Sequence, residues 1–173
     1  MRFSAKGLSL HVDAFPSQRE LRQALSRLSD AATLQLGDET GQFLLLHARR
    51  GSVSLAVGLC LEAESWPQVH LTDGERILLG FGSQLVQLLV AEGRVLWQAF
   101  LGAPFRELIE LEELDRLLVI HDQGAVCLSP EGEELWRHDR DLVEQYAIKR
   151  ESLILRFAKA PGVRLDLLTG ERR

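Results

Sequence analysis

The sequence predicts a mainly β fold made of short antiparallel hairpins, with one helix in an α+β unit at the N-terminus. Three stretches share one pattern at a spacing of about 40 residues, which is typical of blade-type β architecture. Arg76 to Val86 (RILLGFGSQLV) and Arg116 to Val126 (RLLVIHDQGAV) each contain an apolar run, a polar or glycine-bearing turn and a return strand. A third, degraded copy begins at Ser152. Residues 1–64 do not follow the repeat and contain a helical pattern instead.

Residues 1–64 predict a β-α-β-β unit. Ser17 and Glu20 form a capping box that begins a helix over residues 17–30. The strands are expected at about Phe3 to Val12, Thr33 to Leu36, Gln42 to Ala48 and Ser52 to Leu61. The proline in the segment SWPQ places a soft boundary near residue 64, before the repeats of residues 65–173. Because the linker is so short, we expect the two parts to pack as one compact unit.

Each of the first two repeats continues into a glycine turn and a tryptophan. These are Gly93 to Trp97 (GRVLW) and Gly132 to Trp136 (GEELW). The third copy, VRLDLLTGE, aligns without gaps on VQLLVAEGR and has Gly170 at the turn, with no tryptophan after it. We expect both tryptophans at equivalent buried positions, because large aromatic side chains usually belong to the core.

Turn residues divide the repeats into short strands joined by antiparallel hairpins. The expected strands are Val69 to Leu71, Arg76 to Phe81, Leu85 to Ala91, Val95 to Leu101, Arg106 to Leu111, Arg116 to Ile120, Ala125 to Ser129, Leu135 to His138, Val143 to Lys149, Ser152 to Ala158 and Val163 to Leu168. The run RELIELEELD, which contains the fifth of these strands, also fits helical spacing, so periodicity leaves strand and helix open there.

Residues 66–173 resemble the β-propeller repeats of the quinoprotein-like class, with LDLLTGE, GRVLW and GEELW as the best local matches. The resemblance implies propeller-like blades and structural docking roles for Trp97 and Trp136. Three blades are fewer than the four to eight that propellers typically use, so the resemblance implies an open, incomplete array. Either the N-terminal unit caps this array, or two chains complete a ring together as a homodimer.

Composition and charge exclude several classes of function. The formal net charge of −5 opposes nucleic-acid binding, which needs clustered Lys and Arg. The N-terminus lacks the apolar core of a signal peptide, and no window approaches the roughly 20 apolar residues of a membrane span. We therefore expect a cytoplasmic protein. Cys60 and Cys127 lie in apolar strands and are expected to be reduced and buried.

No catalytic, metal or cofactor motif emerges, and we expect a protein that is not an enzyme and binds no cofactor. The two His-Asp dipeptides, at His121 and His138, suggest a metal phosphohydrolase only superficially. Adjacent residues on a strand point to opposite faces, so these are interpreted as strand-end polar residues. The histidines and cysteines show no zinc-binding spacing.

Acidic residues are the strongest candidates for a binding surface. The candidate residues are Glu107, Glu110, Glu112, Glu113, Asp115, Glu131, Glu133, Glu134, Asp139 and Asp141. The favoured hypothesis is an interaction protein whose acidic surface docks a basic partner, in one version an immunity or antitoxin-like inhibitor of a toxin. The alternative is a small-ligand sensor that uses the concave face of the blades, where Trp66 or Arg106 could line a pocket.

Overall fold

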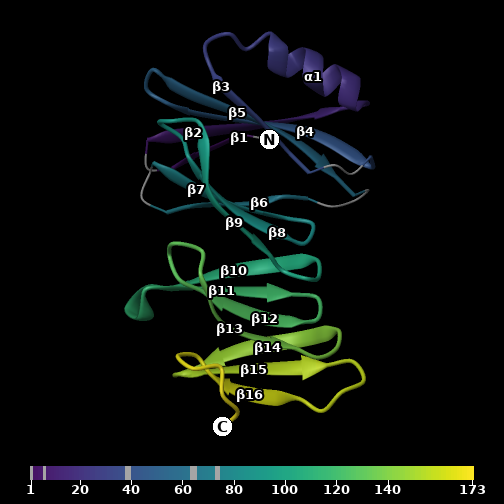
Figure 1. Cartoon of the computed structure of the whole chain (residues 1–173), viewed down its shortest axis with the longest axis vertical. Helices are drawn as coiled ribbons and strands as arrows, with labels where there is room; N and C mark the ends of the chain where they lie inside the picture. The colour runs from purple at the N-terminus through teal and green to yellow at the C-terminus, as the bar shows by residue number, and fades with distance from the viewer. Residues whose placement is uncertain (1, 6, 38–39, 63–65, 73–74) are drawn as a thin grey trace. The chain divides into compact units, whose positions relative to one another are not determined.

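The computed structural model describes residues 2–5, 7–37, 40–62, 66–72 and 75–173, and it is mainly β (Figure 1). Strand accounts for 60% and helix for 8% of the structure. The described residues form four sheets rich in antiparallel pairs, none of them closed into a barrel, and one α-helix. The fold class predicted from the sequence is therefore confirmed.

The first sheet has five strands in the order β1-β2-β4-β5-β3. Its strands are β1 (Arg2–Ala5), β2 (Leu8–Phe15), β3 (Ala32–Leu36), β4 (Gln42–Arg50) and β5 (Val53–Leu61). β3 pairs with β5 in parallel, and the other pairs are antiparallel. The prediction of one strand from Phe3 to Val12 was wrong, because Gly7 turns the chain at φ +77° and Ala5 then pairs with Leu8.

Helix α1 (Gln18–Ser26) covers one face of this sheet (Figure 1). The Ser17 side chain accepts a hydrogen bond from the Glu20 N–H at 3.3 Å, as the capping box predicts. Leu21 and Leu25 are buried and pack against Leu45, Ala56 and Cys60 of β4 and β5. The helix ends earlier than predicted, because the N–H groups of Arg27 and Leu28 turn back to the carbonyls of Ala24 and Leu25.

The repeats form three blade-like sheets. Their strand orders are β6-β7-β8-β9, β10-β11-β12-β13 and β14-β15-β16. The strands are β6 (Gln68–Leu71), β7 (Arg76–Phe81), β8 (Gln84–Leu89), β9 (Arg94–Phe100), β10 (Phe105–Leu111), β11 (Arg116–His121), β12 (Gly124–Leu128), β13 (Glu134–Asp139), β14 (Val143–Lys149), β15 (Ser152–Phe157) and β16 (Val163–Asp166). The run RELIELEELD, left open as strand or helix, is strand as far as Leu111 and a single 3-10 turn, η1 (Glu112–Leu114), beyond it.

The chain divides into two compact units. Unit 1 contains residues 1–82 and 86–98, and unit 2 contains residues 83–85 and 99–173. The boundary predicted near residue 64 lies outside the described residues. One core within unit 1 joins leucines of β4 and β5 to Ile77, Leu79, Val86 and Leu88, so both sides of that predicted boundary share buried apolar contacts.

A second core holds unit 2 together and includes Leu118, Trp136, Leu153 and Leu165. Cys60 and Cys127 are both buried free thiols, as predicted. Burial raises the pKa of the Cys127 thiol, which keeps it in the unreactive protonated form. The helix that the described residues contain is too short to cross a membrane.

Candidate interaction surface

Two chain connections carry acidic side chains at the same end of the β10-β13 sheet. One connection joins β10 to β11, where Leu111 pairs with Arg116, and the other joins β12 to β13, where Leu128 pairs with Glu134. Leu117 pairs with Leu128, which brings both connections to one end of the sheet. We call this group the acidic end, and it consists of Glu110, Glu112, Glu113, Asp115, Glu131, Glu133 and Glu134.

The side chains of the acidic end are exposed, and most form no ion pair within the described part of the chain. Glu134 is the exception, because it accepts a hydrogen bond from Arg137 at 2.8 Å. For the other six carboxylates the described part of the chain supplies no ion pair. Like charges held together in this way repel one another, so an incoming positive group would be attracted to them.

The remaining candidate acids lie elsewhere and stabilise the sheets. Glu107 accepts a hydrogen bond from the Tyr146 hydroxyl. Burial, with Glu107 adding to it, raises the pKa of Tyr146 to about 12. Asp141 accepts the N–H groups of Leu142 at 2.8 Å and of Lys159 at 3.0 Å. The structure therefore does not bring these two acids, or Asp139, to the acidic end.

Asp139 belongs to a polar cluster at the opposite end of the same sheet. It pairs with Gly124 in the ladder, and its carboxylate lies 3.1 Å from Nε2 of the fully buried His121. His121 Nδ1 accepts the Gln123 N–H at 3.3 Å, which places the ring proton of the neutral form on Nε2, facing Asp139. The two His-Asp dipeptides therefore meet through His121 and Asp139, whereas Asp122 accepts a hydrogen bond from Arg106 Nε at 2.5 Å.

Three arginines in unit 2, Arg106, Arg116 and Arg137, are held by backbone carbonyls. Arg106 also donates to the Val143 carbonyl, so its guanidinium links β10 to β14. Arg137 donates to the carbonyl oxygens of Leu101 at 2.6 Å and Phe100 at 3.1 Å. Sequence analysis missed Arg137, because the acceptors lie 36 and 37 residues away in sequence and no local pattern marks them.

His121, which is buried, and His138, which is half-buried, predict a loss of stability in weak acid. Burial lowers the pKa of His121 below its usual 6.5, opposed by Asp139, and burial also lowers the pKa of His138. Below about pH 6.5 the unfolded chain therefore binds protons that the folded chain excludes, and the free energy of unfolding should fall by up to about 1.4 kcal/mol per pH unit for His121 and by less for His138, which solvent partly screens. Urea unfolding between pH 7.5 and 5.5 measures this slope.

The variants His121→Gln and His138→Gln test the origin of that slope. Each should flatten it between pH 6.5 and 5.5, and the double variant should flatten it most, whatever its absolute stability. An unchanged slope in the double variant would show that other groups bind the protons.

The repeat glycines lie outside the strands, and the two tryptophans lie on strands β9 and β13. Trp136 is 8% exposed, and its Nε1–H donates to the Leu167 carbonyl at 3.1 Å. Gly170, at φ +71°, lies against the indole, because a Cβ there would be 2.7 Å from the ring. Trp97 differs from the expectation of full burial and is half-buried on β9. Gly93 and Gly132 have φ of +61° and +84°.

Comparison with known proteins supports the fold alone. No protein-family model and no curated protein matches the sequence. The crystal structure of HIRA(644–1017) superposes on 100% of this chain and 51% of that chain, with a TM-score of 0.51 and 8% identity. The computationally designed Ika8 protein has a TM-score of 0.48 at 13% identity and covers 99% of this chain and 59% of its own.

A third similar structure is BamB from Moraxella catarrhalis, with a TM-score of 0.47 and 15% identity over 99% of this chain and 51% of that chain. The chain thus spans about half the length of the HIRA and BamB chains. Together with the blade-like sheets, the similarity to HIRA(644–1017) supports a β-propeller-like fold.

Proposed function

We propose that this chain is a non-enzymatic protein-protein interaction protein that binds a basic partner through the acidic end of the β10-β13 sheet. The observation that carries the proposal is the convergence of two connections at one end of a rigid sheet, with six carboxylates that have no ion pair in the described chain. Proteins with blade-like sheets commonly carry binding residues on such connections.

Complementary charge supplies specificity and speed of association more than affinity. The acidic end would attract a cationic surface, while the half-buried or exposed apolar residues near it, such as Leu114 and Leu135, would supply contact area. One finer version of the proposal is an immunity or antitoxin-like protein that covers the basic active site of a toxin. Its support is the small size and the acidic net charge of −5.

The proposal predicts that neutralising the acidic end weakens partner binding. The partner is first isolated by affinity purification of the tagged chain from its host, and a stoichiometric basic protein is expected. The triple variant Glu110→Gln, Glu112→Gln, Glu113→Gln should then bind it roughly tenfold or more weakly at low salt, with a reduced dependence on ionic strength. Surface plasmon resonance at two salt concentrations measures both effects.

A matched control tests whether binding depends on the position of the carboxylates or only on the net charge of the chain. The triple variant Glu20→Gln, Glu62→Gln, Glu144→Gln changes the net charge equally at exposed positions outside the two connections that form the acidic end. It should bind nearly as tightly as the parent. Equal losses in the two triple variants, or purification of a bare monomer or homodimer, would contradict the proposal.

A further inference from the structure

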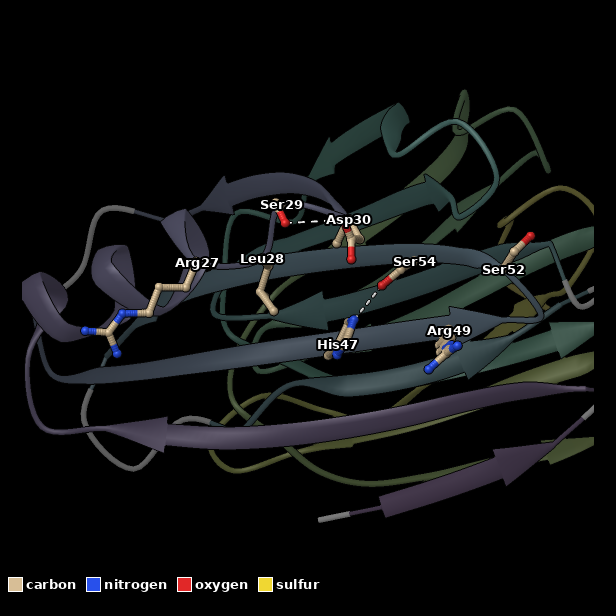
Figure 2. Close-up of a pocket in the computed structure, with 9 residues that line it drawn as sticks. Arg27, Leu28, Ser29, Asp30, His47, Arg49, Ser52 and Ser54 are labelled. Atoms are coloured by element: carbon tan, nitrogen blue, oxygen red, sulfur yellow. Dashed lines mark hydrogen bonds between the residues drawn. The ribbon is translucent and has the colours of Figure 1, made fainter.

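A pocket of about 400 Å³ lies in unit 1, between the end of α1 and the β4-β5 hairpin (Figure 2). The segment that follows α1 forms one wall, and side chains of the hairpin form the other. The lining residues are Arg27, Leu28, Ser29, Asp30, Ala31, His47, Arg49, Ser52 and Ser54. The volume is within the range of about 300–1,000 Å³ that is usual for small-molecule sites.

Asp30 on one wall and Arg49 on the other carry opposite charges. Asp30 follows the C-terminal end of α1, where the helix dipole is negative, and one of its carboxylate oxygens points toward His47 and Ser54 in Figure 2. Arg49 lies on β4, in the opposite wall. Its Nε donates to the Gly51 carbonyl at 3.1 Å, which orients the guanidinium and leaves both terminal nitrogens to donate elsewhere.

These opposite charges do not neutralise each other. Asp30 accepts a hydrogen bond from the neighbouring Ser29 hydroxyl at 3.2 Å, and the described part of the chain gives it no ion pair with Arg27 or Arg49. Elsewhere in unit 1, by contrast, Arg50 pairs with Glu75 at 3.1 Å. An unpaired carboxylate and an unpaired guanidinium therefore line the same cavity.

Between the charged groups lies a hydrogen-bonded pair. His47 Nε2 is 2.5 Å from Ser54 Oγ, across the β4-β5 ladder, and both side chains are half-buried (Figure 2). Leu28 adds an apolar contact to the wall. Polar groups fixed by a sheet in this way can orient a ligand that the charges attract.

We propose that this pocket binds a small zwitterion of the amino-acid class. The ligand carboxylate would accept hydrogen bonds from the terminal nitrogens of Arg49, and its ammonium group would donate to Asp30, with the His47-Ser54 pair between them. A simple anion fits less well, because it would bring a negative charge toward Asp30 without a compensating donor. The guanidinium of Arg27 points away from His47 and Ser54 in Figure 2, which places it at the rim.

The test uses the whole chain and defined probes. Each of the twenty standard amino acids is titrated singly and followed by amide chemical shifts, with acetate and ethylammonium as probes that carry only one of the two charges. At least one amino acid should bind with a Kd tighter than about 1 mM. Shifts should concentrate at residues 27–31, 47–49 and 52–54, while both single-charge probes should bind at least about tenfold more weakly.

Two variants that each remove one charge assign the charges. Asp30→Asn and Arg49→Gln should each weaken amino-acid binding by about tenfold or more, while only Arg49→Gln should weaken binding of acetate. The control Arg19→Gln removes an exposed arginine of α1 outside the pocket and should leave binding unchanged. Circular dichroism confirms that each variant folds.

Three outcomes would overturn the proposal. They are the absence of binding by every amino acid, binding that both variants leave intact, and binding of acetate as tight as that of any amino acid with no effect of Asp30→Asn. The last result would identify a simple anion site. None of these outcomes bears on the acidic end, which lies in unit 2.

Discussion

Trp136→Ala should lower the free energy of unfolding by roughly 3–5 kcal/mol, the usual cost of removing a buried aromatic side chain. Trp136 is 8% exposed and belongs to the unit 2 core with Leu118, Leu153 and Leu165. Its removal would leave a cavity under the turn that follows β16. It would also leave the Leu167 carbonyl without the indole N–H that it accepts at 3.1 Å.

The turn that receives Trp136 is shaped for an aromatic ring. Asp166 Oδ1 accepts the N–H groups of Leu168 at 2.7 Å and Thr169 at 2.9 Å, which holds the backbone in a tight turn. The same hydrogen bonds, that of Thr169 first, lower the pKa of the Asp166 carboxyl. The backbone of Gly170 then packs directly against the indole, and a Cβ at this position would lie 2.7 Å from the ring atoms of Trp136.

Urea unfolding followed by circular dichroism measures this loss of stability. Two further variants serve as comparisons. Trp136→Phe keeps a ring but loses the N–H, and should cost less than Trp136→Ala. Leu135→Ala changes the adjacent residue on β13, which is 43% exposed, and should stay within about 0.5 kcal/mol of the parent. A cost for Trp136→Ala no larger than that of Leu135→Ala would show that the indole is not a blade anchor.

Local pattern was sufficient to predict the strands of the repeats. β7 and β14 begin and end as expected, and in β7 turn residues bound the apolar run on both sides. Helix α1 begins where its Ser17 cap predicts, for the same local reason. Such signals depend on neighbours in sequence, so no knowledge of the packing was needed.

Long-range pairing explains what the sequence did not reveal. The acidic candidates formed one group in the sequence, but strand register places Glu112 and Glu131 at one end of the sheet and Asp139 at the other. The pocket was also missed. His47 meets Ser54 only through the β4-β5 ladder, and Asp30 joins them only because α1 packs on that sheet.

Gly93→Ala should lower the free energy of unfolding by roughly 2–4 kcal/mol, because two costs add. Gly93 has φ +61°, where a side chain is strained, and a Cβ there would lie 1.9 Å from the Cβ of Ala32 at the start of β3. Gly82→Ala isolates the first cost, since Gly82 has φ +48° and no atom within 4 Å of the added Cβ. It should cost only about 1 kcal/mol.

The second cost can be measured by a double-mutant cycle with Ala32→Gly, which removes the clashing atom. The backbone Cα of Ala32 is 3.4 Å from the added Cβ, so the double variant has room for ordinary van der Waals contact. Chemical denaturation of the four proteins should therefore give a favourable coupling energy of at least about 1 kcal/mol. Strictly additive costs would mean that Gly93 is required for its backbone conformation alone and that β3 does not pack against this turn.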